Sequence, residues 1–302
     1  KNSANYPIFF LIFSFQTVSC QDFFVNDDFL KIHQQIILFQ HNDALKHIQT
    51  AKARDKNNLL YSYLESNIYF IKAFLNETSA DKNNYIQKFT QWEKSLKNSN
   101  KKSPFHRYCL GNLYLQRALI QFKHGSYVKA GIDFRRANGL LEENKKLFPN
   151  FIAQNKELGL IHAFVGTIPQ QYSWLVNFIG FSGSISQGEA ELMKVFNESI
   201  KNTELNYLQV ESFMGLSILT SMLNYEQDSY SKLLSLAEKV SPIYQTSPIY
   251  IYYKVVLLKN SGHNNLAINE LKRYNNTNSQ MRFDYLDYLH GLLLLQKNDN
   301  NA

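Results

Sequence analysis

Histidines and carboxylates are the side chains of this sequence with the chemistry for catalysis or metal binding. The chain of 302 residues contains 8 His. His41 and His47 are six positions apart and fall on different faces of a helix, and the other histidines are scattered. A metal site needs several such ligands on converging faces. The sequence therefore predicts no metal site.

His162 stands apart from the other histidines because it lies in an apolar helical segment. Two interpretations are open for it: a core histidine whose nitrogens are satisfied inside the protein, or a ligand or base in a binding site. The first interpretation is favoured.

Patterns that would indicate an active site are missing from the sequence. Ser182-Gly183-Ser184 is not a nucleophile elbow, and Gly180-x-x-Gly183 lacks the spacing and strand context of a nucleotide loop. The carboxylates near these glycines fit solvated faces or helix caps and form no acid/base pair: Glu142, Glu143, Glu189 and Glu191. The sequence therefore predicts a protein that is not an enzyme and that needs no cofactor.

The N-terminal segment predicts export. Lys1 is followed by an uncharged stretch whose apolar centre is residues 8–13. This run is too short to span a bilayer, which takes about 20 apolar residues. A basic start, a short apolar run and a small-residue site are typical of a secretory signal, so we assign residues 1–20 to a signal segment.

The end of the signal segment allows two kinds of processing. Ser19-Cys20 resembles a bacterial lipobox, in which the cysteine is lipidated, although Thr17 stands where a lipobox has Leu. Lipidation of Cys20 would bring the protein into contact with a membrane, and plain cleavage near Cys20 is the alternative. Either way Cys109 has no partner in the mature chain, and its apolar helix predicts a buried, inert thiol.

Composition favours a packed protein without a nucleic-acid partner. The hydrophobic content of 44% is enough for a core, and the formal net charge of +7 is spread along the chain. The densest basic stretch, residues 94–107, coincides with a predicted loop, and no zinc, RNA-binding or phosphate-loop motif accompanies it.

Helical periodicity runs through nearly the whole chain after Asp27, and one spacing recurs. A small or aromatic residue is followed at i+4 and i+7 by apolar residues, and successive first positions lie 41, 45, 58, 45 and 34 residues apart. Such intervals are typical of stacked helix pairs. The units are Ala44/Ile48/Ala51, Tyr85/Phe89/Trp92, Ala130/Phe134/Ala137, Gly188/Leu192/Val195, Leu233/Ala237/Val240 and Ala267/Leu271/Tyr274.

Each of these helices is preceded by another apolar helix, which we call its leading helix. The sequence thus predicts an all-α fold, an α-α superhelix of about six helix pairs plus a C-terminal capping helix over residues 21–302, with a Gly/Pro-rich interruption at 166–188. The leading helices and the cap are predicted at Phe29–Phe39, Leu59–Leu75, Phe105–Lys123, Phe151–Phe164, Leu205–Leu223, Pro248–Lys259 and Arg282–Gln296.

Capping residues mark the starts of three helices. Ser103-Pro104 and Ser247-Pro248 each combine a capping hydroxyl with Pro at the first helical position. Residues 186–189 predict a capping box, in which Ser186 accepts from a free backbone N–H and Glu189 reaches back to another.

The helix pairs resemble tetratricopeptide repeats. The unit that carries this resemblance best is Leu110-Gly111-x-x-Tyr114, then Tyr127-x-x-Ala130-x-x-x-Phe134-x-x-Ala137, closing on Phe148-Pro149. The central stretch is similar to the signature of the tetratricopeptide-39 and inclusion-body-clearance proteins, with Gly166-Thr167-Ile168-Pro169 and Ile179-Gly180-Phe181-x-Gly183. The resemblance implies a helical repeat protein linked to lipid and protein homeostasis. The signal segment indicates a Bacteroidetes-type bacterial relative, located in the periplasm or outer membrane.

Two functions follow as hypotheses. In the first, the protein is a non-enzymatic scaffold that binds a protein or peptide partner in the concave groove of the stacked pairs. Tyrosines of the leading helices would be aromatic anchors in this groove: Tyr61, Tyr63, Tyr69, Tyr114 and Tyr207. In the second, it is a component of envelope transport that binds a lipid or small molecule in a cavity near His162, Tyr172, Trp174 and Phe181.

Overall fold

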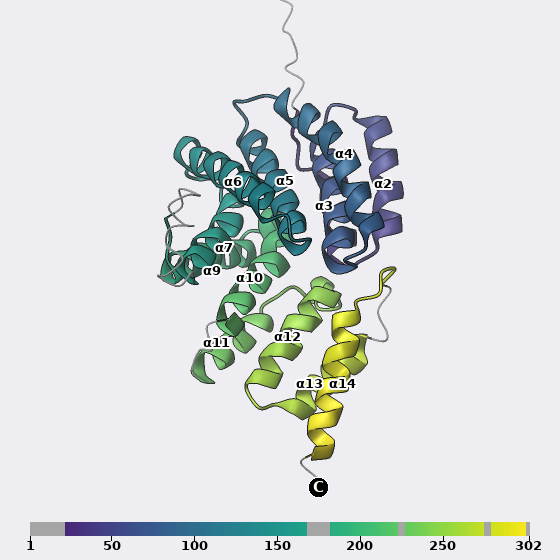
Figure 1. Ribbon diagram of the computed structural model, residues 1–302, viewed down its shortest axis with the longest axis vertical. Helices are drawn as coiled ribbons and strands as arrows, with labels where there is room; N and C mark the ends of the chain where they lie inside the picture. Colours follow the sequence, from purple (N-terminus) through teal and green to yellow (C-terminus); the bar gives the residue numbers. More distant parts are fainter. Residues whose placement is uncertain (1–21, 168–181, 223–226, 275–278, 300–302) are drawn as a thin grey trace, which may run out of the picture.

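Helices dominate the structure (Figure 1). The computed structural model describes residues 22–167, 182–222, 227–274 and 279–299. These residues form thirteen α-helices and two short 3-10 helices, and no β-strand occurs among them. The prediction of an all-α fold is confirmed. Among the helices of the described ranges, none combines the length and the apolar character that crossing a bilayer requires.

The α-helices follow one another in pairs, and most contacts join helices that are adjacent in the sequence, as in a helical repeat arrangement. The pairs are α1 (Asp27–Ile37) with α2 (His41–Arg54), α3 (Leu60–Leu75) with α4 (Ser79–Lys97), α5 (Pro104–Lys123) with α6 (Tyr127–Leu147), α7 (Gln154–Thr167) with α9 (Ile185–Lys201), α10 (Gln209–Met222) with α11 (Gln227–Ala237), and α12 (Pro248–Asn260) with α13 (Asn264–Tyr274). The remaining elements are η2 (Thr203–Leu208) before α10, η3 (Pro242–Tyr244) before α12, and α14 (Asp284–Asp299).

The recurring spacing places its residues in the core, because positions i, i+4 and i+7 share one face of a helix. Tyr85, Phe89 and Trp92 of α4 are each at most 2% exposed. In α2 the corresponding residues Ala44 and Ile48 are equally buried. The pattern found in the sequence therefore marks the second helix of each pair and the face by which it packs.

Helix starts confirm two of the three predicted caps. The hydroxyls of Ser103 and Ser247 accept hydrogen bonds from the first turns of α5 and α12. The capping box at residues 186–189 is wrong, because α9 begins two residues earlier than predicted. Its N-cap is Ser184, which has extended backbone angles and whose hydroxyl accepts from the Gln187 N–H at 3.1 Å.

Glycines let α7 and α9 approach each other closely. A Cβ atom on Gly188 would lie 2.3 Å from the carbonyl oxygen of Gly159 and 2.6 Å from the Cβ of Ala163. No side chain fits at that distance, so the two backbones are in direct contact here. Gly159 and Gly188, from the glycine-rich centre of the sequence, therefore allow α7 and α9 to pack against each other.

The first helix pair contacts the far end of the chain, so the array closes on itself. Phe29 of α1 packs edge-on against Tyr207 of η2, with ring centroids 5.4 Å apart. Phe39, in the turn between α1 and α2, lies 5.5 Å from the Phe283 ring just before α14. These contacts leave all four rings at most 6% exposed.

Candidate functional site

The tyrosines predicted as groove anchors lie mostly inside the protein. Tyr61, Tyr63, Tyr114 and Tyr207 are at most 6% exposed, and Tyr69 is half-buried. The expectation that they project from an open groove is wrong for the first four, because closure of the array and packing between pairs cover them. Whether any of them binds a partner stays a prediction.

Two of these tyrosines have clear structural partners. The Tyr61 hydroxyl accepts a hydrogen bond from Asn26 Nδ2 at 2.9 Å, which ties α3 to the N-cap of α1. The Tyr114 hydroxyl donates to the carboxylate of Glu93, which ties α5 to α4. A buried phenol needs such a partner, so these contacts account for both residues without a ligand.

His162 is held between two carboxylates from neighbouring helices. Its Nδ1 lies 2.6 Å from Glu191 Oε2 on α9, and its Nε2 lies 3.0 Å from Glu142 Oε1 on α6. Lys145 Nζ of α6 approaches the other Glu191 oxygen at 2.6 Å. The His162 side chain is only 4% exposed. The arrangement fits the core-histidine interpretation, and it leaves neither ring nitrogen free for a ligand.

The two carboxylates also decide the charge of His162. Burial lowers the pKa of its imidazole, but the hydrogen bonds with Glu142 and Glu191 outweigh burial and raise the pKa to about 9. The ring is therefore protonated at neutral pH. It acts as a cation that joins α6, α7 and α9, and a protonated imidazole cannot serve as a general base.

This network predicts a loss of stability at high pH. Because the folded-state pKa of His162 is above its ordinary value of 6.5, the contribution is complete below that value and disappears as the pH rises through about 9. We expect His162→Gln to lower the free energy of unfolding by about 2–3 kcal/mol at pH 6 and by much less at pH 10. Urea titrations followed by circular dichroism measure this, and an equal effect at both pH values would contradict it.

Four residues of the predicted sites lie outside the described ranges: Cys20, Tyr172, Trp174 and Phe181. Neither the predicted lipidation nor the predicted cavity is tested by the structure. Within the described ranges, no group of three His, Cys, Asp or Glu residues could hold a metal ion. Burial raises the pKa of the Cys109 thiol well above its usual value, which fits a buried, inert cysteine.

A surface that the sequence analysis did not single out carries large apolar side chains in solvent. Val128 is 76% exposed and Tyr127 is 64% exposed on the first turns of α6. Phe122, at the end of α5, lies edge-on to Tyr127 with ring centroids 5.3 Å apart. We call this surface the α6 face, and it consists of Phe122, Tyr127, Val128 and Ile132.

The sequence does contain a signal for the α6 face. Val128 and Ile132 are four positions apart, and they lie on the opposite side of the helix from the recurring unit that begins at Ala130. An amphipathic helix of a globular protein has one apolar side. A second apolar side therefore indicates either a second buried contact or an exposed binding surface, and the structure shows it exposed.

Basic side chains accompany the apolar ones on α6. Lys129 and Arg135 are exposed, and neither has an acidic partner among the described residues. Arg136 is different, because it pairs with Asp133 at 3.4 Å. The α6 face therefore combines apolar area with unpaired positive charge.

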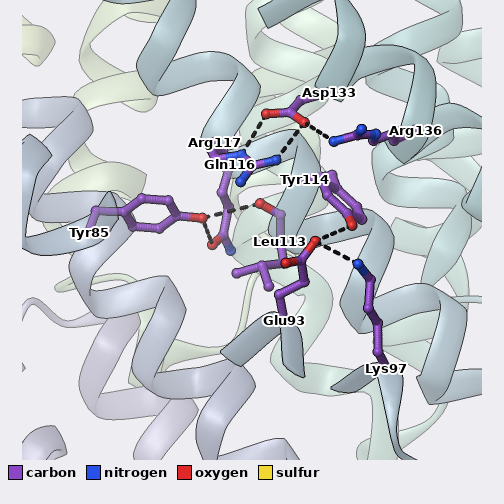
Figure 2. A network of polar contacts seen from close by, with 9 residues as sticks. All are labelled: Tyr85, Glu93, Lys97, Leu113, Tyr114, Gln116, Arg117, Asp133 and Arg136. Atoms are coloured by element: carbon purple, nitrogen blue, oxygen red, sulfur yellow. Dashed lines mark hydrogen bonds and ion pairs between the residues drawn. The ribbon is translucent and has the colours of Figure 1, made fainter. Parts of the chain in front are cut away.

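A network of polar contacts between α5 and α6 holds α6 in place (Figure 2). Asp133 is 2% exposed, and its carboxylate accepts from Arg117 Nε at 2.6 Å and from Arg117 Nη2 at 2.7 Å. The Arg117 guanidinium also stacks on the Phe89 ring of α4, 3.6 Å from its centroid. The Arg117 guanidinium thus joins α4, α5 and α6. These contacts fix the orientation of α6 and of the side chains that it exposes.

Comparison of the chain with models of known protein families, with curated proteins and with solved structures finds no match.

Proposed function

We propose that the chain is a non-enzymatic helical-repeat scaffold that binds an acidic, apolar segment of a partner protein on the α6 face. The observation that carries the proposal is the exposure of four large apolar side chains beside cations that have no partner within the described ranges. Apolar side chains grouped in solvent are typical of a protein-binding surface. The unpaired Lys129 and Arg135 select a partner with carboxylates.

The cellular setting belongs to the same proposal and depends on the sequence. The helix pairs are of the tetratricopeptide-like kind, and the chain acts after export into the periplasm or at the outer membrane. The signal segment supports export, and lipidation of Cys20 would anchor the scaffold to the membrane. The segment it binds then belongs to another protein of the cell envelope.

A designed peptide tests the proposal directly. The probe is a fluorescein-labelled amphipathic helix with Leu at i, i+3, i+4 and i+7 and Glu elsewhere, titrated with the purified chain and followed by anisotropy. We expect saturable binding that weakens with added salt. The double variant V128E/I132E should lose at least about tenfold in affinity, because it places like charges against the peptide and removes apolar contact.

The matched control is Leu295→Glu, which changes a residue that is 63% exposed on α14. It should bind the peptide as the wild type does. Both sets of changes are on the surface, so the unfolding midpoint should move little. Equal binding by V128E/I132E and the wild type, or an equal loss in Leu295→Glu, would refute the α6 face as the site.

A further inference from the structure

The leading helices bury a group of ionisable side chains where α1, α7 and α10 come together. We call it the inner cluster, and it consists of His33, Lys156, Glu157 and Glu211. The side chains of the first three are 7% exposed or less, and that of Glu211 is 22% exposed. The cluster therefore meets solvent on the Glu211 side.

Lys156 is the centre of the inner cluster. Its Nζ lies 2.9 Å from Glu157 Oε1 and 2.9 Å from Glu211 Oε1. The second Glu211 oxygen lies 3.4 Å from His33 Nε2. Burial raises the pKa of Glu211, but Lys156 and His33 outweigh it and bring the pKa down to about 2, so this carboxylate is ionised.

Two atoms of the inner cluster have no hydrogen-bond partner among the residues that the structure describes. Glu157 Oε2 is buried and unpaired, and so is His33 Nδ1. An unpaired buried oxygen of a carboxyl group is costly, because it loses its hydration without compensation. Burial raises the pKa of Glu157, and the nearby Glu211 carboxylate adds to this rise, although Lys156 opposes it.

Tyrosine rings surround the inner cluster. Tyr207 packs edge-on against the His33 ring with centroids 5.2 Å apart. The hydroxyls of Tyr63 and Tyr108 lie 3.5 Å from each other. Burial raises the pKa of Tyr63 and Tyr207, and the charges of Lys156 and Glu211 act on both phenols, so both phenols are neutral. Neutral aromatic rings around carboxylates are a favourable setting for a cation.

We infer that the inner cluster binds the ammonium group of a small amine. Glu157 and Glu211 share one lysine ammonium, that of Lys156. The N–H groups of the amine would supply the donor that Glu157 Oε2 lacks, and the tyrosine rings would contact its alkyl part. The amine would enter on the Glu211 side. This site is separate from the α6 face, so each can fail without the other.

The alternative is that the inner cluster only stabilises the fold. Buried ion pairs are often no better for stability than apolar residues of the same volume, because desolvation cancels much of the attraction. Buried polar atoms of proteins nearly always have a partner, and an ammonium would supply one for Glu157 Oε2. Both considerations favour a binding role.

Calorimetric and thermal titrations of the full chain test the inference with methylammonium and ethanolamine as probes. We expect saturable binding heat and a rise of the melting temperature with each probe, because a ligand of the native state stabilises it. Tetramethylammonium has no N–H donor, so it should bind at least about tenfold more weakly, since the loss of one charge-assisted hydrogen bond leaves the acceptor unpaired. Potassium chloride at equal ionic strength should give no saturable signal.

The decisive variant is Glu157→Gln, which should lower the affinity for ethanolamine at least about tenfold. Its matched control is Glu65→Gln, because Glu65 is also a mostly buried carboxylate paired with two lysines but lies outside the inner cluster. The control should bind as the wild type does. Retained binding in Glu157→Gln overturns the inference. If that variant does not fold, the titrations of the wild-type chain still test the inference. The absence of a saturable response to both methylammonium and ethanolamine would also overturn the inference.

Discussion

Asp133→Asn should lower the free energy of unfolding by about 3–5 kcal/mol, since removal of one partner leaves the other charge of a buried pair uncompensated. Asp133 is buried, and it accepts both hydrogen bonds that Arg117 offers from the side of α5 (Figure 2). Asparagine has the same shape as aspartate, but its amide nitrogen is a donor. The Arg117 guanidinium would therefore lose the acceptor of one of its two hydrogen bonds. Urea denaturation followed by circular dichroism gives the change in stability.

The same substitution at an exposed pair provides the control. Arg282 also places two nitrogens on one aspartate, Asp287, at 3.0 Å and 2.7 Å, but both side chains are more than half exposed. Water screens that pair, so Asp287→Asn should leave the unfolding midpoint unchanged. Similar losses at the two positions would mean that burial of Asp133 is not what makes its pair important.

Gly188→Ala should destabilise the protein by about 3 kcal/mol, at the upper end of what overpacking of a core costs. The added methyl group would meet the backbone of α7, with the Gly159 oxygen at 2.3 Å and the Ala163 nitrogen at 2.8 Å. Backbone atoms cannot rotate away as a flexible side chain can. The helices α7 and α9 must therefore separate, and the shift would also stretch the His162 contacts to Glu191.

Gly139→Ala is the matched control for this prediction. Gly139 lies in the interior of α6, and a Cβ atom added there would meet nothing within 4 Å. Alanine is the better helix residue, so this change should raise stability by about 0.5–1 kcal/mol. Denaturation of both variants under one set of conditions measures the contrast. A neutral Gly188→Ala would show that α7 and α9 can move apart at little cost.

The sequence predicted the helices well because their signals are local. Each leading helix overlaps an observed helix, and five of the six recurring units lie within one, whereas Val240 of the remaining unit lies beyond the end of α11. Ser103 and Ser247 cap helices as expected. These features depend on residues within one or two turns of each other. The one wrong cap is Ser186, which was predicted where Ser184 caps α9. The start of this helix was therefore misplaced by only two residues.

The candidate sites were predicted less well because they depend on distant contacts. Nothing near Tyr207 in the sequence indicates that Phe29 and His33 of the first helix cover it. Nothing near Lys156 indicates that Glu211 will pair with it. The satisfied state of His162 was favoured correctly, but its two carboxylate partners come from other helices and could not be named in advance.

Periodicity, capping hydroxyls and helix-stopping residues act over a few positions, so a series of paired helices can be predicted from the sequence alone. Which faces meet solvent depends on how these helices pack against one another. Contacts between distant helices buried Tyr207, Lys156 and Glu157, while Val128 and Ile132 stayed exposed. The physical reason is that burial depends on what packs across a face, and that partner lies far away in the chain.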